Sequence, residues 1–104
     1  MVLDVRFLPN PYWVEELKAH TGLQPAVAAY VLDNSTGREF LDRFEPFLLF
    51  VLDSHRRAER QEVRLAVGCT GGQHRSVAVT DHLRRFLERE RFAVRVFHRD
   101  LDKA

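Results

Sequence analysis

The residues best suited to chemistry lie in one short stretch, residues 68–76, which reads GCTGGQHRS. The stretch contains the only cysteine of the chain, Cys69, then two adjacent glycines and an arginine, Arg75. A mostly apolar run at 63–67 precedes it, and a segment with helical periodicity follows from Ser76. A loop between a strand and a helix can bind an anion, because the helix N-terminus carries unpaired N–H groups and a partial positive charge. The sequence therefore predicts a phosphate-binding loop.

The residue types within the loop fit this role. Gly71 and Gly72 allow positive φ and close approach of a ligand to the backbone. Arg75 offers a planar set of donors for two phosphate oxygens, and Ser76 can cap the following helix. The predicted ligand-binding residues are Thr70, Gly71, Gly72, Gln73, His74, Arg75 and Ser76.

The same stretch also has the spacing of cysteine phosphatases, in which a cysteine is followed after five residues by arginine and serine. In such enzymes the thiolate attacks phosphorus, while the loop and the arginine hold the phosphoryl oxygens. The reaction needs a general acid, and the candidates Asp4, Asp100 and Asp102 lie in no recognisable acid loop. A lone cysteine at the end of a core strand also behaves as a small hydrophobic residue. Catalysis by Cys69 and Arg75 is therefore an alternative, and a non-catalytic role is preferred.

Several other classes of function are disfavoured. The loop lacks the Gly-Lys-Ser/Thr ending of a Walker A motif, so ATP hydrolysis is not expected. One cysteine cannot supply a zinc-finger pair, and we expect neither a metal nor a cofactor. No apolar run approaches about 20 residues, and no signal peptide is recognisable, so we expect a cytoplasmic protein without a membrane partner.

The elements that must position the loop follow from the apolar pattern. We predict strands over 2–8, 63–67 and 92–97, and helices over 12–19, 25–32 and 76–89. A broad apolar face at 40–52 predicts a further helix, in which Pro46 either kinks one helix or begins a second. Alternation of strands and helices predicts a single α/β domain over 1–104, three-layer-like, with a short, mainly parallel sheet flanked by helices.

Ligands bind parallel sheets beyond the carboxyl ends of the strands, where loops distant in sequence meet. The ends of the first and third predicted strands would therefore contribute residues to the phosphate loop. The predicted pocket-lining residues are Arg6, Asn10, Tyr12, His98 and Arg99.

A basic helix face offers a second kind of partner. Arg84, Arg85 and Arg89 recur on one side of the predicted helix 76–89. Such a face is most often simply solvated, but its density of arginine makes it a candidate for contact with RNA phosphates.

Four segments resemble the C-terminal domain of the RapZ/YvcJ family, bacterial RNase adapter and nucleotide-binding proteins. They are GCTGGQHRSV at 68–77, DVRFLPNPYW at 4–13, TGL at 21–23 and HRDL at 98–101. The resemblance implies a binding domain for small regulatory RNAs and for an amino-sugar phosphate, glucosamine-6-phosphate. It places the sugar-phosphate site at 70–75, with Arg6, Asn10 and Tyr12 lining the pocket. It also implies a homo-oligomer.

The family's N-terminal P-loop domain has no counterpart in this sequence, so nucleotide hydrolysis is not carried over. Three hypotheses remain. The leading one is a non-catalytic regulatory domain that binds a phosphorylated small molecule. The others are a cysteine-dependent phosphatase and a domain that binds RNA alone.

Overall fold

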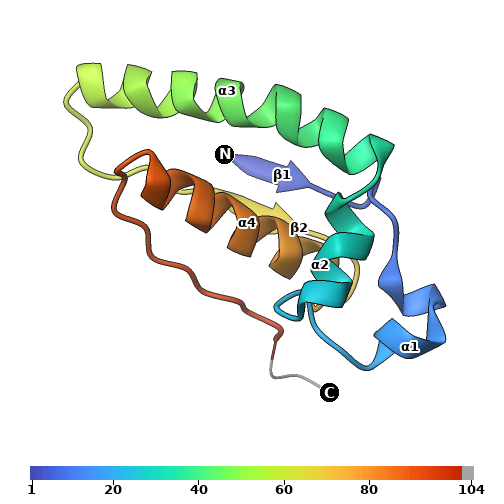
Figure 1. Ribbon diagram of the computed structural model, residues 1–104. Coiled ribbons are helices and arrows are strands. Elements are labelled where there is room, and N and C mark those ends of the chain that lie inside the picture. Colours follow the sequence, from blue (N-terminus) through green and yellow to red (C-terminus); the bar gives the residue numbers. More distant parts are fainter. Residues whose placement is uncertain (102–104) are drawn as a thin grey trace.

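The computed structural model describes residues 1–101 and shows an α/β domain with a short parallel sheet flanked by helices, as predicted (Figure 1). Its elements are β1 (Val2–Asp4), the 3-10 helix η1 (Pro11–Trp13), α1 (Glu15–Lys18), α2 (Pro25–Leu32), α3 (Ser35–Arg57), β2 (Ala66–Gly68) and α4 (Arg75–Arg89).

The sheet consists of β1 and β2, which pair in parallel with Val2 opposite Ala66 and Leu3 opposite Val67. Leu3 and Val67 pack against the core, whereas Val2 is 84% exposed. Side chains alternate between the two faces of a strand, so the apolar residues of one face meet the helices. The core beneath them is built from β1, the turn after it, α2, α3 and α4, with Val5, Leu8, Val27, Val31, Leu48, Val79 and Leu83 all buried.

The first strand is shorter than the predicted range 2–8. After Asp4 the chain turns, because the Asp4 carboxylate accepts a hydrogen bond from the Arg6 backbone N–H at 3.0 Å. The Leu8 N–H then donates to the Val5 carbonyl at 3.1 Å and closes the turn. The second strand is also shorter than predicted and lies slightly later, at Ala66–Gly68.

The predicted third strand over 92–97 is wrong, since the described part of the chain shows no strand there. Arg91 adopts a φ of 69°, and the Phe92 N–H bonds back to the Leu87 carbonyl at 2.9 Å. The Arg56 guanidinium of α3 then lies over the Phe92 ring, with its carbon 4.6 Å from the ring centre. These contacts direct the segment along α4, away from β2 (Figure 1).

The helix predictions agree with the structure at α2, agree to within one residue at α4, and need revision before and around Pro46. Residues 12–19 form η1 and α1 as separate pieces, because Val14 between them is extended, with φ −109° and ψ 113°. The alternatives left open at Pro46 are decided in favour of one long helix, α3, which runs through it. The Asn34 side chain caps this helix by accepting from the Gly37 N–H at 2.9 Å, and the helix ends at Arg57.

Candidate functional site

The candidate site is the loop that joins β2 to α4. Gly71 and Gly72 have φ values of 81° and 68°, in the left-handed region that favours glycine. α4 begins at Arg75, one residue earlier than predicted, so the backbone N–H groups of its first turn stand next to the loop. The sequence therefore builds the strand, loop and helix arrangement that suits an anion.

A cavity of about 600 Å³ opens beside this loop. Its walls come from two parts of the chain that are distant in sequence: the η1 region and the loop itself, closed by Asp100. The lining residues are Asn10, Tyr12, Trp13, Thr70, Gly71, Gln73, His74 and Asp100. The structure thus brings the segment after β1 together with the loop after β2, although β1 ends earlier than expected.

His74 connects the loop to the end of α1. Its side chain is nearly buried, and Nε2 lies 3.1 Å from the Lys18 carbonyl oxygen. A carbonyl oxygen can only accept, so Nε2 carries the proton and donates. The Lys18 ammonium in turn lies 4.5 Å from the centre of the Tyr12 ring. His74, Lys18 and Tyr12 therefore hold one wall of the cavity against the other.

Arg75 lies behind the loop and is 6% exposed. Its Nη1 donates to the Arg6 carbonyl at 2.7 Å and to the Leu8 carbonyl at 3.4 Å. This contact fixes the turn after β1 to the start of α4. Arg75 is not among the lining residues of the 600 Å³ cavity. The predicted phosphate clamp therefore lies outside this cavity, and the donors that the two carbonyls leave unused are Nε and Nη2.

Cys69 lies under the first turn of α4. Its sulfur accepts a hydrogen bond from the Ser76 backbone N–H at 3.2 Å, and the Ser76 hydroxyl is 3.3 Å away. An N–H group at the start of α4 therefore contacts the sulfur directly. However, Cys69 lines a different, larger groove and not the 600 Å³ cavity.

The three candidate general acids differ in their placement. Asp4 forms an exposed ion pair with Arg6 at 2.7 Å, and a hydrogen bond from the Arg6 side chain is the main cause that lowers the pKa of its carboxyl. Asp100 lies against the loop, since a Cβ on Gly72 would stand 2.8 Å from its Oδ2. Asp102 lies outside the described residues. Asp100 is therefore the described acid closest to the loop glycines.

Of the five predicted pocket-lining residues, the structure places Asn10 and Tyr12 in the 600 Å³ cavity. The Arg6 guanidinium turns to Asp4 instead. His98 and Arg99 line the larger groove, and Arg99 also pairs with Asp100 at 3.0 Å. The structure therefore does not place these three residues in this cavity.

Two residues at the site were missed. Trp13, 79% exposed, lines the cavity, and its only sequence signal was the position next to Tyr12. Gly22 entered the sequence analysis only within the segment 21–23, but its N–H donates to the Gln73 carbonyl at 2.8 Å. A Cβ on Gly22 would stand 2.3 Å from the His74 carbonyl oxygen and 2.4 Å from the Ala78 nitrogen. Glycine at this position therefore permits the close packing of the 21–23 segment against the loop.

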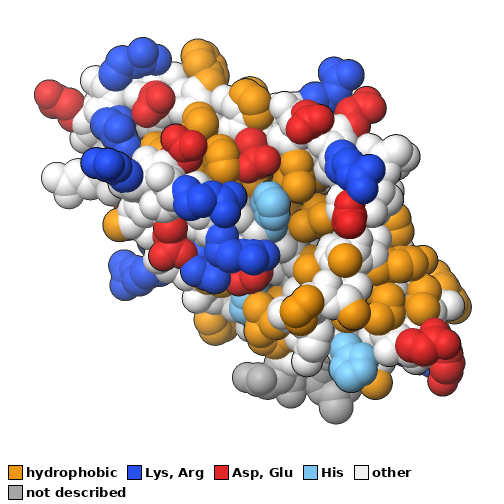
Figure 2. Space-filling model, in the orientation of Figure 1, with side chains coloured by type: hydrophobic (Ala, Val, Ile, Leu, Met, Phe, Trp, Pro, Cys, Tyr) orange, Lys and Arg blue, Asp and Glu red, His pale blue; other side chains and the backbone are white. Residues whose placement is uncertain are grey.

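The predicted RNA face carries mixed charge. Arg84 pairs with both Asp81 and Glu88, and Arg85 approaches Asp81 at 3.4 Å. Figure 2 shows Lys and Arg side chains interspersed with Asp and Glu over this part of the surface. RNA contact at Arg84, Arg85 and Arg89 stays a prediction.

Two further properties concern residues 1–101 only. No helix in this range is long and apolar enough to cross a membrane. No group of three or more His, Cys, Asp or Glu side chains in the same range is arranged to hold a metal ion.

Comparison with known proteins identifies the domain. The family model described as the RapZ C-terminal domain matches residues 1–102. A nucleotide-binding protein of Mycobacteroides abscessus is 51% identical over 104 residues, which are 99% of this chain and 35% of that protein. Nucleotide-binding proteins of Geotalea daltonii and Mycobacterium avium are 45% and 48% identical, again over 99% of this chain and 36% of theirs. The chain thus spans about a third of the length of these relatives, and it belongs to the RapZ C-terminal domain family.

Proposed function

We propose that this chain is a regulatory domain that binds a phosphorylated small molecule, an amino-sugar phosphate such as glucosamine-6-phosphate, without catalysing a reaction. One observation supports this most strongly: a 600 Å³ cavity opens on the glycine loop at the start of α4. Cavities of this size suit small ligands, and the loop presents backbone N–H groups. The nucleotide-binding name of the relatives fits a ligand that carries phosphate.

In this proposal the phosphate binds at residues 70–74 and the sugar extends toward η1. The loop amides and the α4 dipole stabilise the negative charge. The rings of Tyr12 and Trp13, which contact each other edge to face at 5.0 Å, form an apolar wall for the sugar. The Asn10 side chain caps η1 by accepting from the Tyr12 N–H at 3.1 Å, which holds Tyr12 in place.

Arg75 supplies positive charge from behind the loop. Its Nη1 is committed to two backbone carbonyls, so the phosphate would be clamped by Nε and Nη2. A charge-assisted hydrogen bond is stronger than a neutral one. Arg75 would therefore serve both the fold of the turn after β1 and the affinity for the ligand.

The test is a titration with glucosamine-6-phosphate, followed by the fluorescence of Trp13, the only tryptophan of the chain. We expect saturable binding that weakens at least about tenfold in Arg75→Lys, which keeps the charge but loses the planar set of donors. Arg85→Lys, on the exposed face of α4, is the matched control. Equal affinity of the wild type and both variants would contradict the role of Arg75.

A small regulatory RNA is the further partner that we propose, at the arginine face of α4. Phosphate contacts make such binding steeply dependent on salt. Substitution of Arg85 and Arg89 by Ala should weaken RNA binding and reduce the salt dependence. RNA binding that is absent, or insensitive to salt, would contradict the RNA proposal.

We also propose homo-oligomer formation, which sedimentation of the chain would test.

The alternative is a cysteine-dependent phosphatase, which the contacts of Cys69 favour. Ser76 donates to the sulfur, as a nucleophilic thiolate requires, and Asp100 stands near the loop. Turnover of an aryl phosphate that vanishes in Cys69→Ser would establish this alternative. Turnover that is absent between pH 5 and 8, or unchanged in the variant, would eliminate it.

A further inference from the structure

The open edge of β2 is a second surface of interest. In a strand, successive main-chain groups point alternately to the two sides. Ala66 and Gly68 turn theirs toward β1, since the Ala66 N–H donates to Met1 and the Gly68 carbonyl accepts from Val5, both at 2.9 Å. The main-chain groups of Val67 therefore face the other side, and so do those of Leu65 and Cys69, two residues before and after it. The described chain places no strand on that side.

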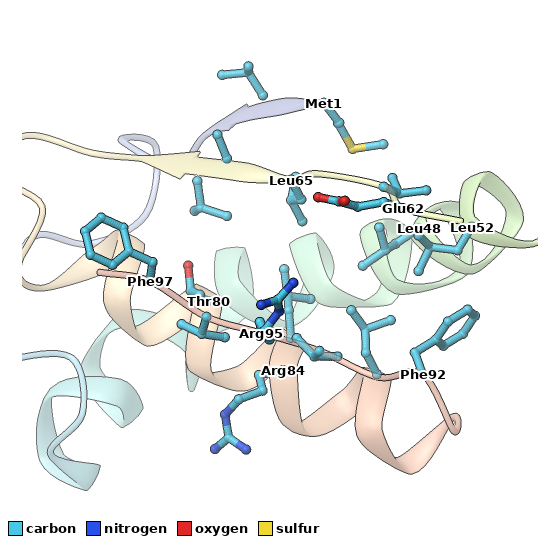
Figure 3. Close-up of a pocket in the computed structure, with 18 of the residues that line it drawn as sticks. Met1, Leu48, Leu52, Glu62, Leu65, Thr80, Arg84, Phe92, Arg95 and Phe97 are labelled. Carbon is cyan, nitrogen blue, oxygen red and sulfur yellow. The ribbon is translucent and has the colours of Figure 1, made fainter. Parts of the chain in front are cut away.

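A groove of about 770 Å³ runs along this edge. β2 forms one wall, the segment 92–99 forms the opposite wall, and α3 and α4 form the floor. Figure 3 shows Leu65 pointing from the β2 side into the groove, with Leu48 and Leu52 of α3 beyond it. Among the described residues, Asp100 alone lines both this groove and the 600 Å³ cavity. The groove is thus a separate, apolar-floored channel beside an unpaired strand edge.

The rim of the groove is cationic. Arg95 extends from the 92–99 segment toward β2 (Figure 3), and the exposed Arg60 also lines the groove. Within residues 1–101, neither arginine has a carboxylate within ion-pair distance. The acidic Glu62 on the same rim is already paired with Arg64 at 2.8 Å. The groove therefore complements an occupant with negative charge.

We propose that the open edge of β2 binds an extended peptide segment of a partner protein, with alternating apolar and acidic residues, as an added strand. The main chain of the peptide would pair with Leu65, Val67 and Cys69. Its apolar side chains would pack on the floor, and its acidic side chains would face Arg60 and Arg95. A peptide fits better than RNA, because the strand edge offers both N–H donors and carbonyl acceptors, which another main chain can pair with, and because the floor is apolar.

The test uses the ¹⁵N-labelled chain and blocked hexapeptides. A peptide of alternating valine and glutamate should bind, and the amides of Val67 and Cys69 should exchange with solvent at least about tenfold more slowly. The amide of Ala66, already bonded to β1, is the internal control. A valine and lysine peptide should bind at least about tenfold more weakly. An N-methylated acidic peptide, which has lost main-chain donors, should not bind.

A charge-reversal variant makes the proposal sharper. The double substitution Arg60→Glu and Arg95→Glu lies on the rim and should invert the preference, so that the lysine peptide binds better than the glutamate peptide. No binding of the acidic peptide at millimolar concentration would overturn the proposal. So would binding without protection of Val67 and Cys69, an unchanged preference in the variant, or an oligoribonucleotide that binds the groove in place of the peptide. Protection of both amides in the free chain would show that residues 92–98 already fill the edge, which also overturns it.

Discussion

Gly22→Ala tests whether the 21–23 segment positions the phosphate loop. The new Cβ would stand 2.3 Å from the His74 carbonyl oxygen and 2.4 Å from the Ala78 nitrogen, and both atoms belong to backbone. Backbone cannot rotate away as a side chain can, so the segment and the start of α4 must separate. Such overpacking costs about 1–3 kcal/mol. Weakening of the hydrogen bond from the Gly22 N–H to the Gln73 carbonyl adds roughly 0.5–1.5 kcal/mol.

Alanine also restricts the unfolded chain, which offsets about 0.4–1 kcal/mol of this loss. We therefore expect Gly22→Ala to lower the free energy of unfolding by about 2 kcal/mol, measured by urea denaturation. Gly68→Ala is the matched control, because a Cβ there meets nothing within 4 Å, and it should leave stability unchanged or raise it by up to about 1 kcal/mol. Affinity for glucosamine-6-phosphate should also fall in Gly22→Ala but not in the control. Equal stability of the two variants would show that the close packing of Gly22 against the start of α4 does not stabilise the fold.

Three further predictions concern the helices. Pro46→Ala should raise the free energy of unfolding by about 1–3 kcal/mol in urea, because Pro46 is exposed inside α3 and lacks an N–H; a loss of stability would contradict this. Asn34→Ala should lower it by about 1 kcal/mol, since the side chain caps α3; an unchanged denaturation midpoint would contradict the cap. Burial lowers the pKa of His82 below 6.5, with Glu45 as a partial offset, so the unfolded chain takes up the proton first as the pH falls. The contribution of His82 to stability should therefore be full well above pH 6.5 and be lost as the pH falls below it, and His82→Gln should flatten this decline; an identical pH profile would contradict it.

The strand, loop and helix around Arg75 could be predicted because their signals are local. Two adjacent glycines after an apolar run and before a helical period define such a loop in sequence. The structure agrees, with positive φ at Gly71 and Gly72 and a helix from Arg75. The proximity of Asn10 and Tyr12 to this loop could also be predicted, because parallel pairing of two strands brings their carboxyl ends together.

The features that could not be predicted depend on contacts between distant residues. The alternation of Val94 and Val96 indicated a strand, but the contact of Phe92 with Arg56 directs the segment elsewhere. α3 continues through Pro46 because burial of the helix face that includes Leu48 stabilises the helix by more than the proline destabilises it.

The direction in which a long side chain points could not be predicted from the sequence either. Arg75 was expected to face the ligand, but its Nη1 binds the carbonyls of the turn after β1. Nothing in the sequence could show that these two carbonyls would lie within its reach. Gly22 likewise has a role that becomes visible only once α4 is packed against it.

The central claim is that a phosphorylated small molecule binds at the loop between β2 and α4. The most direct measurement is a titration of the ¹⁵N-labelled chain with glucosamine-6-phosphate, with inorganic phosphate as the minimal probe. We expect the largest amide shifts at residues 70–76, and with the sugar phosphate we expect them to extend to Tyr12 and Trp13 on the facing wall. Absence of saturable shifts with both ligands, or shifts that leave residues 70–76 unchanged, would contradict it.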